Sequence, residues 1–86
     1  MKLNVLFFAS LREDVGCESV ALELASGSFA ELRSVLIERL GAQRCEALWA
    51  ENVRIARNQA LVSGPVSEQA FADGDELAFL PPVTGG

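Results

Sequence analysis

Apolar and polar residues alternate along five short stretches of the chain, which is the pattern of half-buried β-strands. The first stretch becomes apolar on both faces towards its end, as a central strand of a sheet requires. The last stretch runs directly into two prolines, where the ladder of hydrogen bonds has to stop. The predicted strands are residues 2–9, 18–24, 53–57, 60–62 and 76–80.

One amphipathic helix is predicted between the second and third strands. Ser28 and Glu31 have the spacing of a capping box, in which the serine caps the helix and the glutamate reaches back. Gly41 is expected to end the helix. The residues at helical spacing between them, which should face the core, are Phe29, Leu32, Val35, Leu36 and Leu40. Residues 42–49 form a weaker helical stretch.

Turns are expected between these elements. Residues 10–16 end in a glycine and are predicted to form the turn between the first two strands. Asn58 and Gln59 are predicted to form a tight hairpin turn, because asparagine tolerates the positive φ that such a turn demands. Residues 73–75, Asp-Gly-Asp, are interpreted as a turn and not a calcium loop, since the ligand spacing of a calcium loop is missing.

The order of elements predicts an α+β fold of the β-grasp, ubiquitin-like type. A single helix covers only one face of a mixed sheet. A hairpin, a helix crossing over it and a last strand returning beside the first strand give this topology. A chain of 86 residues is large enough for one domain on one core. We therefore predict a β-grasp domain over residues 1–80 and an extended tail over residues 81–86.

The uncovered face of this sheet should carry an apolar patch. In the first strand Leu6 and Phe8 point away from the helix, and in the last strand Ala78 and Leu80 do so. These two strands are neighbours in a β-grasp sheet. The four side chains would then lie together at the base of the tail, where an exposed apolar surface favours a protein partner.

The tail has the composition of a stiff stalk with a slim end. Pro81 and Pro82 fix their own φ and remove two backbone donors, and Val83 and Thr84 favour extended geometry. Gly85 and Gly86 have no side chain, so the walls of an active site could close around their backbone. Six residues could reach about 20 Å from the domain. We predict that the patch docks and that the end of the tail reacts.

Composition excludes several classes of function. The net charge of −5 argues against nucleic acid and anionic membranes as partners, since phosphate binding needs clustered lysine and arginine. Without histidine, the chain lacks the usual acid–base catalyst at neutral pH. No signal peptide and no membrane-spanning stretch is evident, and we expect a cytoplasmic protein.

The two cysteines, Cys17 and Cys45, match no metal spacing. They are too few for a four-cysteine iron–sulfur cluster, which excludes a β-grasp ferredoxin. We expect free, reduced thiols and no bound metal.

Both ends of the chain resemble a known family. The opening motif is Val5-Leu6-Phe7-Phe8-Ala9, followed by Leu11-Arg12-Glu13 and Gly16. The hairpin contributes Asn58 with Leu61-Val62, and the ending is Asp73-Gly74-Asp75-Glu76-Leu77-Ala78-Phe79-Leu80-Pro81-Pro82-Val83-Thr84-Gly85-Gly86. On these residues the chain resembles the small subunit of molybdopterin synthase, a ubiquitin-like sulfur carrier. The resemblance spans the whole chain and is loosest between residues 27 and 52.

The resemblance implies a mechanism. An ATP-dependent, E1-like activating enzyme would adenylate the Gly86 carboxyl, and a sulfurtransferase persulfide would displace AMP to leave a thiocarboxylate. The tail would then enter the large synthase subunit and give sulfur to a cyclic pterin precursor, forming the dithiolene of molybdopterin. The expected complex is a heterotetramer of two small and two large subunits. This chain would bind no cofactor and would be a non-catalytic subunit.

One arginine has a role that the resemblance implies, and another departs from the family pattern. The resemblance implies that Arg12 contacts the activating enzyme, although a solvated arginine in the predicted turn is an equally good interpretation of the sequence. Arg57, in the hairpin, stands where an apolar residue is expected, which leaves the surface contacts of that region open.

Three alternatives stay open at this stage. A sulfur carrier for thiamin synthesis or tRNA thiolation shares the fold and the terminal glycines, although the Pro-Pro-Val stalk argues against it. A ubiquitin-like protein modifier also needs an activated glycine. A β-grasp interaction module with an inert tail is the third.

Overall fold

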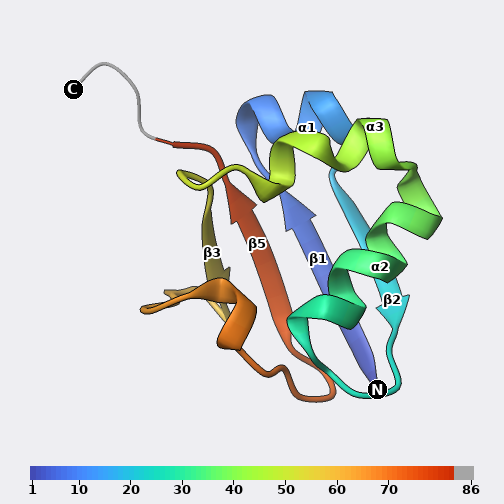
Figure 1. The fold of residues 1–86 in the computed structure, drawn as a ribbon, viewed down its shortest axis with the longest axis vertical. Helices are drawn as coiled ribbons and strands as arrows, with labels where there is room; N and C mark the ends of the chain where they lie inside the picture. The colour runs from blue at the N-terminus through green and yellow to red at the C-terminus, as the bar shows by residue number, and fades with distance from the viewer. Residues whose placement is uncertain (83–86) are drawn as a thin grey trace.

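The computed structural model describes residues 1–82, which form a mixed five-stranded sheet with helices on one face (Figure 1). The strand order is β2-β1-β5-β3-β4. β1 and β5 are parallel neighbours, and the other pairs are antiparallel. The strands are β1 (Lys2–Phe7), β2 (Ser19–Glu23), β3 (Arg54–Arg57), β4 (Ala60–Leu61) and β5 (Glu76–Leu80). The predicted β-grasp topology is confirmed, with the last strand beside the first.

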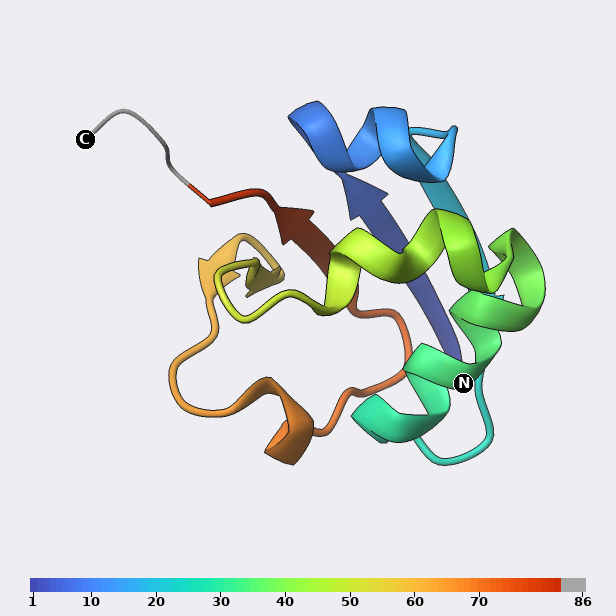
Figure 2. The same ribbon diagram turned by 45° about the horizontal axis from the view of Figure 1, so that its top comes forward.

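The helices lie on the same side of the sheet in both ribbon views (Figures 1 and 2). The α-helices are α1 (Ala9–Val15), α2 (Phe29–Leu40) and α3 (Ala42–Cys45). Two 3-10 helices, η1 (Glu46–Trp49) and η2 (Val66–Glu68), complete the layer. The predicted main helix is confirmed at both ends, and the weaker helical stretch that follows it is α3 with η1.

The predicted turn over residues 10–16 is wrong, because most of it is helix α1. Leu11 and Val15 stand four residues apart and are 3% and 1% exposed, so the helix buries one apolar side against the core. Gly16 ends it at φ 85°, and the Gly16 amide donates to the Arg12 carbonyl at 2.9 Å. Phe8 precedes the helix in extended geometry, so the first strand ends at Phe7 and not at residue 9.

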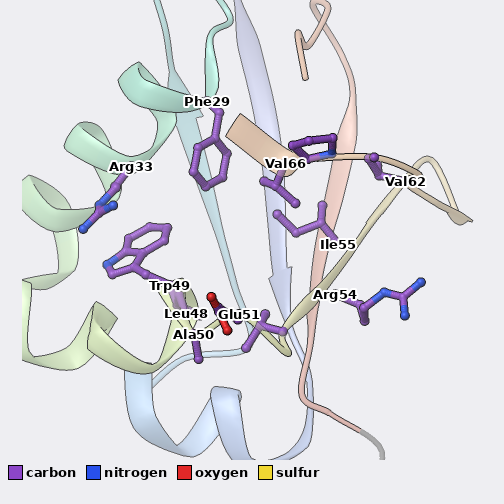
Figure 3. Close-up of a pocket in the computed structure, with 13 residues that line it drawn as sticks. Phe29, Arg33, Leu48, Trp49, Ala50, Glu51, Arg54, Ile55, Val62 and Val66 are labelled. Carbon is purple, nitrogen blue, oxygen red and sulfur yellow. The ribbon is translucent and has the colours of Figure 1, made fainter. Parts of the chain in front are cut away.

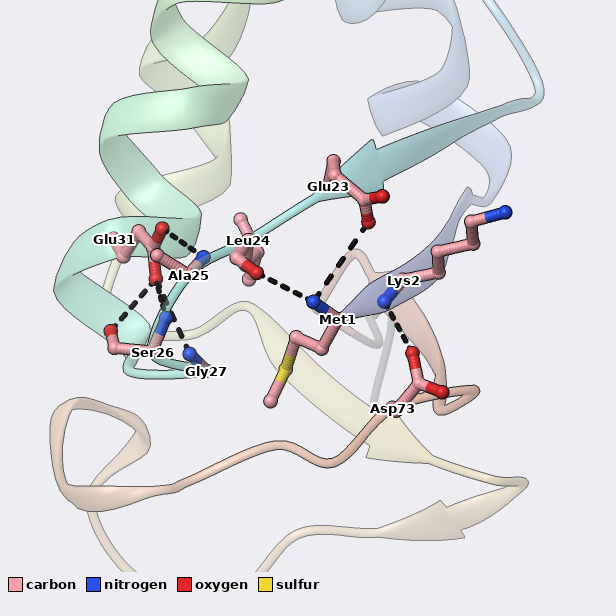
Figure 4. Close-up of polar contacts among 9 residues, drawn as sticks. All are labelled: Met1, Lys2, Glu23, Leu24, Ala25, Ser26, Gly27, Glu31 and Asp73. Carbon is pink, nitrogen blue, oxygen red and sulfur yellow. Dashed lines mark hydrogen bonds and ion pairs between the residues drawn. The ribbon is translucent and has the colours of Figure 1, made fainter.

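The N-terminal cap of α2 is confirmed in one half and differs in the other. Ser28 Oγ accepts a hydrogen bond from the Glu31 amide at 3.1 Å, as a capping box predicts. The Glu31 carboxylate reaches further back, accepting from the amides of Ala25 and Ser26, both at 2.6 Å, and from Gly27 at 3.3 Å (Figure 4). These bonds, led by that from Ala25, lower the pKa of Glu31 to about 2. Glu31 thus holds the β2–α2 loop against the first turn of the helix.

The core lies between the helices and the inner face of the sheet. Its centre consists of Phe7 from β1 and Phe79 from β5, whose rings stack with centroids 5.9 Å apart. Leu32 and Leu36 of α2 cover them and are 0% exposed. As predicted, Leu77 and Phe79 point inward. Among residues 1–82 no helix lies on the opposite face, which is where the candidate site is found.

Candidate docking face and tail base

An apolar row crosses the open face of the sheet. The strand register places Leu6 of β1 beside Ala78 of β5, Ala78 beside Ala56 of β3, and Ala56 beside Leu61 of β4. Side chains alternate along a strand, and the residues that flank Leu6, Ala78 and Ala56 on the core side are buried. They are Val5, Phe7, Ile55, Leu77 and Phe79. The row therefore lies on the face that the helices leave uncovered.

A second pair of apolar residues adjoins this row on the side of the tail. Phe8 continues beside β5, since the Phe8 amide donates to the Phe79 carbonyl at 3.2 Å, and its side chain is 38% exposed. Leu80 is half-buried and faces Arg54 across the ladder. We call the six residues the open-face patch: Leu6, Phe8, Ala56, Leu61, Ala78 and Leu80.

The structure brings together the four residues that the sequence placed in a patch, with one difference. Leu6 and Ala78 are direct partners in the parallel ladder. Ala78, however, is only 8% exposed, because a methyl group between two neighbouring strands is covered by them. Ala78 therefore makes the surface flat, while Phe8 and Leu6 supply the accessible apolar area.

Sequence reasoning missed the far end of the patch. Leu61 is 59% exposed, the largest exposure of any big apolar side chain among residues 1–82, and Ala56 connects it to Ala78. The hairpin turn that was predicted at Asn58 and Gln59 is confirmed, with φ of 50° and 72°. Counting residues outward from that turn pairs Ala56 with Leu61, so the signal was present in the sequence.

The tail leaves from a strand that is held on both sides. β5 pairs with β1 through residues 76–79 and with β3 through residues 77–80. Pro81 and Pro82, which follow directly, are half-buried. The predicted roles of Val83, Thr84, Gly85 and Gly86 lie outside the described residues. The tail thus begins directly where a strand held on both sides ends, at Leu80.

A polar cluster fixes the beginning of β5. Asp75 is 7% exposed, and its carboxylate accepts hydrogen bonds from Arg57 Nε at 2.7 Å, the Ala72 amide at 2.8 Å and Asn58 Nδ2 at 2.9 Å. Asn58 Oδ1 in turn accepts from the Glu76 amide at 2.9 Å. Burial alone would raise the pKa of Asp75, but these hydrogen bonds and the Arg57 charge outweigh it and lower the pKa.

This cluster explains the arginine in the hairpin. The Arg57 side chain is committed to a contact within the chain, where it ties β3 to the residue before β5. Arg57, which stands where an apolar residue was expected, therefore makes its contact at the end of the core and not on the open face.

Arg12 lies on helix α1 and not in a turn. It is exposed, and its Nη1 is 4.0 Å from a carboxylate oxygen of Glu18. An exposed pair of this kind contributes about 0–1 kcal/mol. Arg12 is therefore free to exchange Glu18 for a partner, and its predicted contact with an activating enzyme stays a prediction.

The two thiols belong to the helical part of the chain: Cys45 ends α3, and Cys17 lies between α1 and β2. Cys45 is 0% exposed, with Sγ 3.5 Å from the Leu36 carbonyl oxygen. Burial, and secondarily the charge that a Cys17 thiolate would carry, raises the pKa of the Cys45 thiol. Cys17 is half-buried, and neither sulfur is in a disulfide. A buried thiol with a raised pKa is a poor nucleophile.

Comparison with known proteins identifies relatives over almost the whole chain, including its last residues. Residues 5–86 match the model of the ThiS family. The chain is 42% identical to the molybdopterin synthase sulfur carrier subunit of Haemophilus influenzae, covering 98% of this chain and 99% of that protein. It is 39% identical to the protein of the same name from Escherichia coli, again over 98% of this chain and 99% of that protein.

Solved structures show the same arrangement. A protein complex of subunits 1 and 2 of the molybdopterin-converting factor from Helicobacter pylori contains a chain that superimposes with a TM-score of 0.66 at 29% identity, with full coverage of both chains. The small archaeal modifier protein SAMP1 from Haloferax volcanii superimposes with a TM-score of 0.79, also with full coverage of both. At 23% identity, that second likeness concerns the fold alone. Within residues 1–82, no helix is long and apolar enough to cross a membrane.

Proposed function

From the premise that this chain belongs to the ThiS family, among the molybdopterin synthase sulfur carrier subunits, we propose that Gly86 carries sulfur as a thiocarboxylate. The observation that supports this most is the continuity of β5 with the tail. A strand paired on both sides runs straight into Pro81 and Pro82, with an apolar patch beside its end. The domain therefore presents its last residues to a partner from a fixed base.

The chemistry belongs to the end of the chain and to its partners. A carboxylate is a poor acyl donor, so an activating enzyme transfers AMP from ATP to the Gly86 carboxyl and releases pyrophosphate. The terminal sulfur of a sulfurtransferase persulfide displaces AMP, and reduction of the resulting acyl disulfide by a thiol leaves the thiocarboxylate. The sulfur then attacks a cyclic pterin precursor, and water restores the carboxylate. Two such transfers make one dithiolene.

The open-face patch supplies the docking surface in this proposal. Burying a phenylalanine or leucine contributes about 1.5–3 kcal/mol, so Phe8 and Leu61 together stabilise a complex appreciably. The partner is the large subunit of molybdopterin synthase, in a heterotetramer of two small and two large subunits. The solved complex of subunits 1 and 2 from Helicobacter pylori supports this choice of partner.

The test is chemical and uses the end of the chain. Incubation with an activating enzyme, ATP and a persulfide donor should increase the mass by the exchange of one oxygen for one sulfur at Gly86. Purified large subunit should then convert the pterin precursor. One residue added after Gly86, or removal of Gly86, should abolish conversion while leaving thermal melting unchanged, because the last residues of a chain generally contribute little to stability. A mass increase in the form of lysine-linked adducts would instead indicate a protein modifier.

A further inference from the structure

A groove of about 460 Å³ lies on the helix side of the sheet, at the edge formed by β3 and β4 (Figure 3). One wall comes from α2 and η1, and the other from β3, Val62 and the segment of residues 64–66. The volume is within the range of about 300–1,000 Å³ that binding pockets have. In this domain it is large enough for one or two side chains of a partner.

The inside of the groove is apolar. Leu48 and Ile55 form a floor that is 3% and 4% exposed, while Phe29, Trp49 and Val62 are half-buried around it. The Trp49 ring meets Phe29 edge to face at 6.1 Å, so this wall is fixed in shape. Apolar side chains that line an open hollow leave surface in contact with water, and an apolar occupant would bury it.

The rim carries one arginine, Arg33, without an ion-pair partner among residues 1–82. The Arg33 guanidinium lies 5.0 Å above the Trp49 ring. Arg54 lines the groove from β3, but its side chain points away from it, to the face that carries Leu80 (Figure 3). All ion pairs within 4.0 Å in the described residues involve other cations, although Glu51 also stands on the rim. An exposed arginine without an ion pair, beside an apolar hollow, complements a carboxylate of a partner.

The groove continues the open-face patch around the edge of the sheet. Val62 follows Leu61 directly in sequence, and Arg54 is the ladder partner of Leu80. The strand between the two surfaces, β4, is only two residues long. A protein seated on the open-face patch therefore needs to pass only this short edge to reach the groove.

We propose that the groove is a second docking site for the large subunit, and that it takes a segment with an apolar side chain beside a carboxylate. This inference rests on the proposed function, which names the partner. The apolar side chain packs against Trp49, and the carboxylate pairs with Arg33. The partner would thereby contact β3 and β4 on both faces of the sheet. Contacts on both faces would fix the orientation of the domain on the partner, and with it the direction in which the tail leaves.

Trp49 is the one tryptophan of the chain, so fluorotryptophan incorporation gives a single fluorine NMR signal from the groove. We expect this signal to shift when purified large subunit is added. Arg33→Glu should weaken the complex about tenfold, since it places like charges together. Arg39→Glu is the matched control, because Arg39 is exposed on the same helix outside the groove and its reversal should leave binding unchanged. Thermal melting of both variants checks the fold.

Three results would overturn the proposal. An unshifted signal together with unchanged binding by Arg33→Glu would leave the groove empty in the complex. A shift caused by deleting residues 83–86 without any partner would assign the groove to the chain's own tail. A shift with protein concentration alone would assign it to a second copy. Leu61→Asp separates the two proposals: if it too leaves binding unchanged, docking through the open-face patch fails as well.

Discussion

The two faces of the sheet use the same strands for different purposes. Along β5, Leu77 and Phe79 point inward and are 0% exposed beneath the helices, whereas Ala78 and Leu80 point to the uncovered side. The inner residues fill a closed core, so their burial stabilises the fold. The outer residues have apolar side chains that the fold itself leaves partly uncovered. The comparison teaches that alternate positions of one strand serve the core on one side and the proposed docking face on the other.

The largest effect is expected from emptying the inner face. Phe79→Ala removes a ring that packs against Phe7 and Trp49, and should lower the free energy of unfolding by about 3–5 kcal/mol. Urea denaturation followed by circular dichroism measures this. The matched variant on the other face is Leu61→Ala, which should change it by at most about 0.5 kcal/mol. Equal losses in the two variants would break the distinction between the faces.

A charge introduced on the open face should weaken partner binding and leave the domain folded. Phe8→Asp should weaken binding to the large subunit by about 1.5–3 kcal/mol or more, because an apolar contact is lost and an unpaired charge is buried. Isothermal titration calorimetry gives the affinity. Thermal melting should show a folded domain, since Phe8 is 38% exposed. Wild-type affinity in a folded Phe8→Asp variant would remove Phe8 from the docking surface.

A further variant tests the polar cluster at the beginning of β5, the strand that contributes residues to both faces. Asp75→Ala leaves Arg57 and the Ala72 amide without their acceptor, and should cost about 1–3 kcal/mol of unfolding free energy. The folded pKa of Asp75 lies below 3.8, so its contribution is fully present above pH 3.8 and is lost as the pH falls below it. Urea melts at decreasing pH should show this acid-dependent loss in the wild type and a smaller one in Asp75→Ala.

The smallest effect is expected at the loop before α2, which belongs to neither face. The lowered pKa of Glu31 means that its contribution is complete above pH 4.5 and disappears as the pH falls towards about 2. Glu31→Gln should therefore be less stable than the wild type at neutral pH, and the difference should shrink in this acid range. Thermal melting across the range measures the difference. A constant difference between the two proteins would mean that the Glu31 charge does not contribute.

The elements that could be predicted from sequence are those with local signals. Helix α2 has a cap at Ser28, a regular apolar pattern and a terminating Gly41, and both of its ends were predicted. Helix α1 was missed, because seven residues with a charged centre have little helical stability of their own. Its two buried residues, Leu11 and Val15, form the helix by packing against the core.

The candidate site was predicted in part for the same reason. Leu6 and Ala78 follow from the β-grasp topology together with strand alternation. The local hairpin turn pairs Leu61 with Ala56, but joining this pair to Ala78 requires the register of β3 with β5, which lie far apart in sequence. Arg57 could not be interpreted without Asp75, since its partner is eighteen positions away. The groove is likewise formed by α2, η1 and the hairpin, and no single segment indicates it.

The parallel pairing of β1 with β5 has a mechanical consequence. Consider a force applied between the tail, at the C-terminal end of β5, and the N-terminal end of β1. Because the two strands are parallel, this force would load the backbone hydrogen bonds between them in shear. The bonds between Asn4–Phe7 and Glu76–Phe79 would then share the force, where an antiparallel pair pulled from one end would open bond by bond like a zipper. The parallel pairing should therefore keep β5 in the sheet when a partner pulls on the tail, as the proposed insertion of the tail into a partner's active site would require.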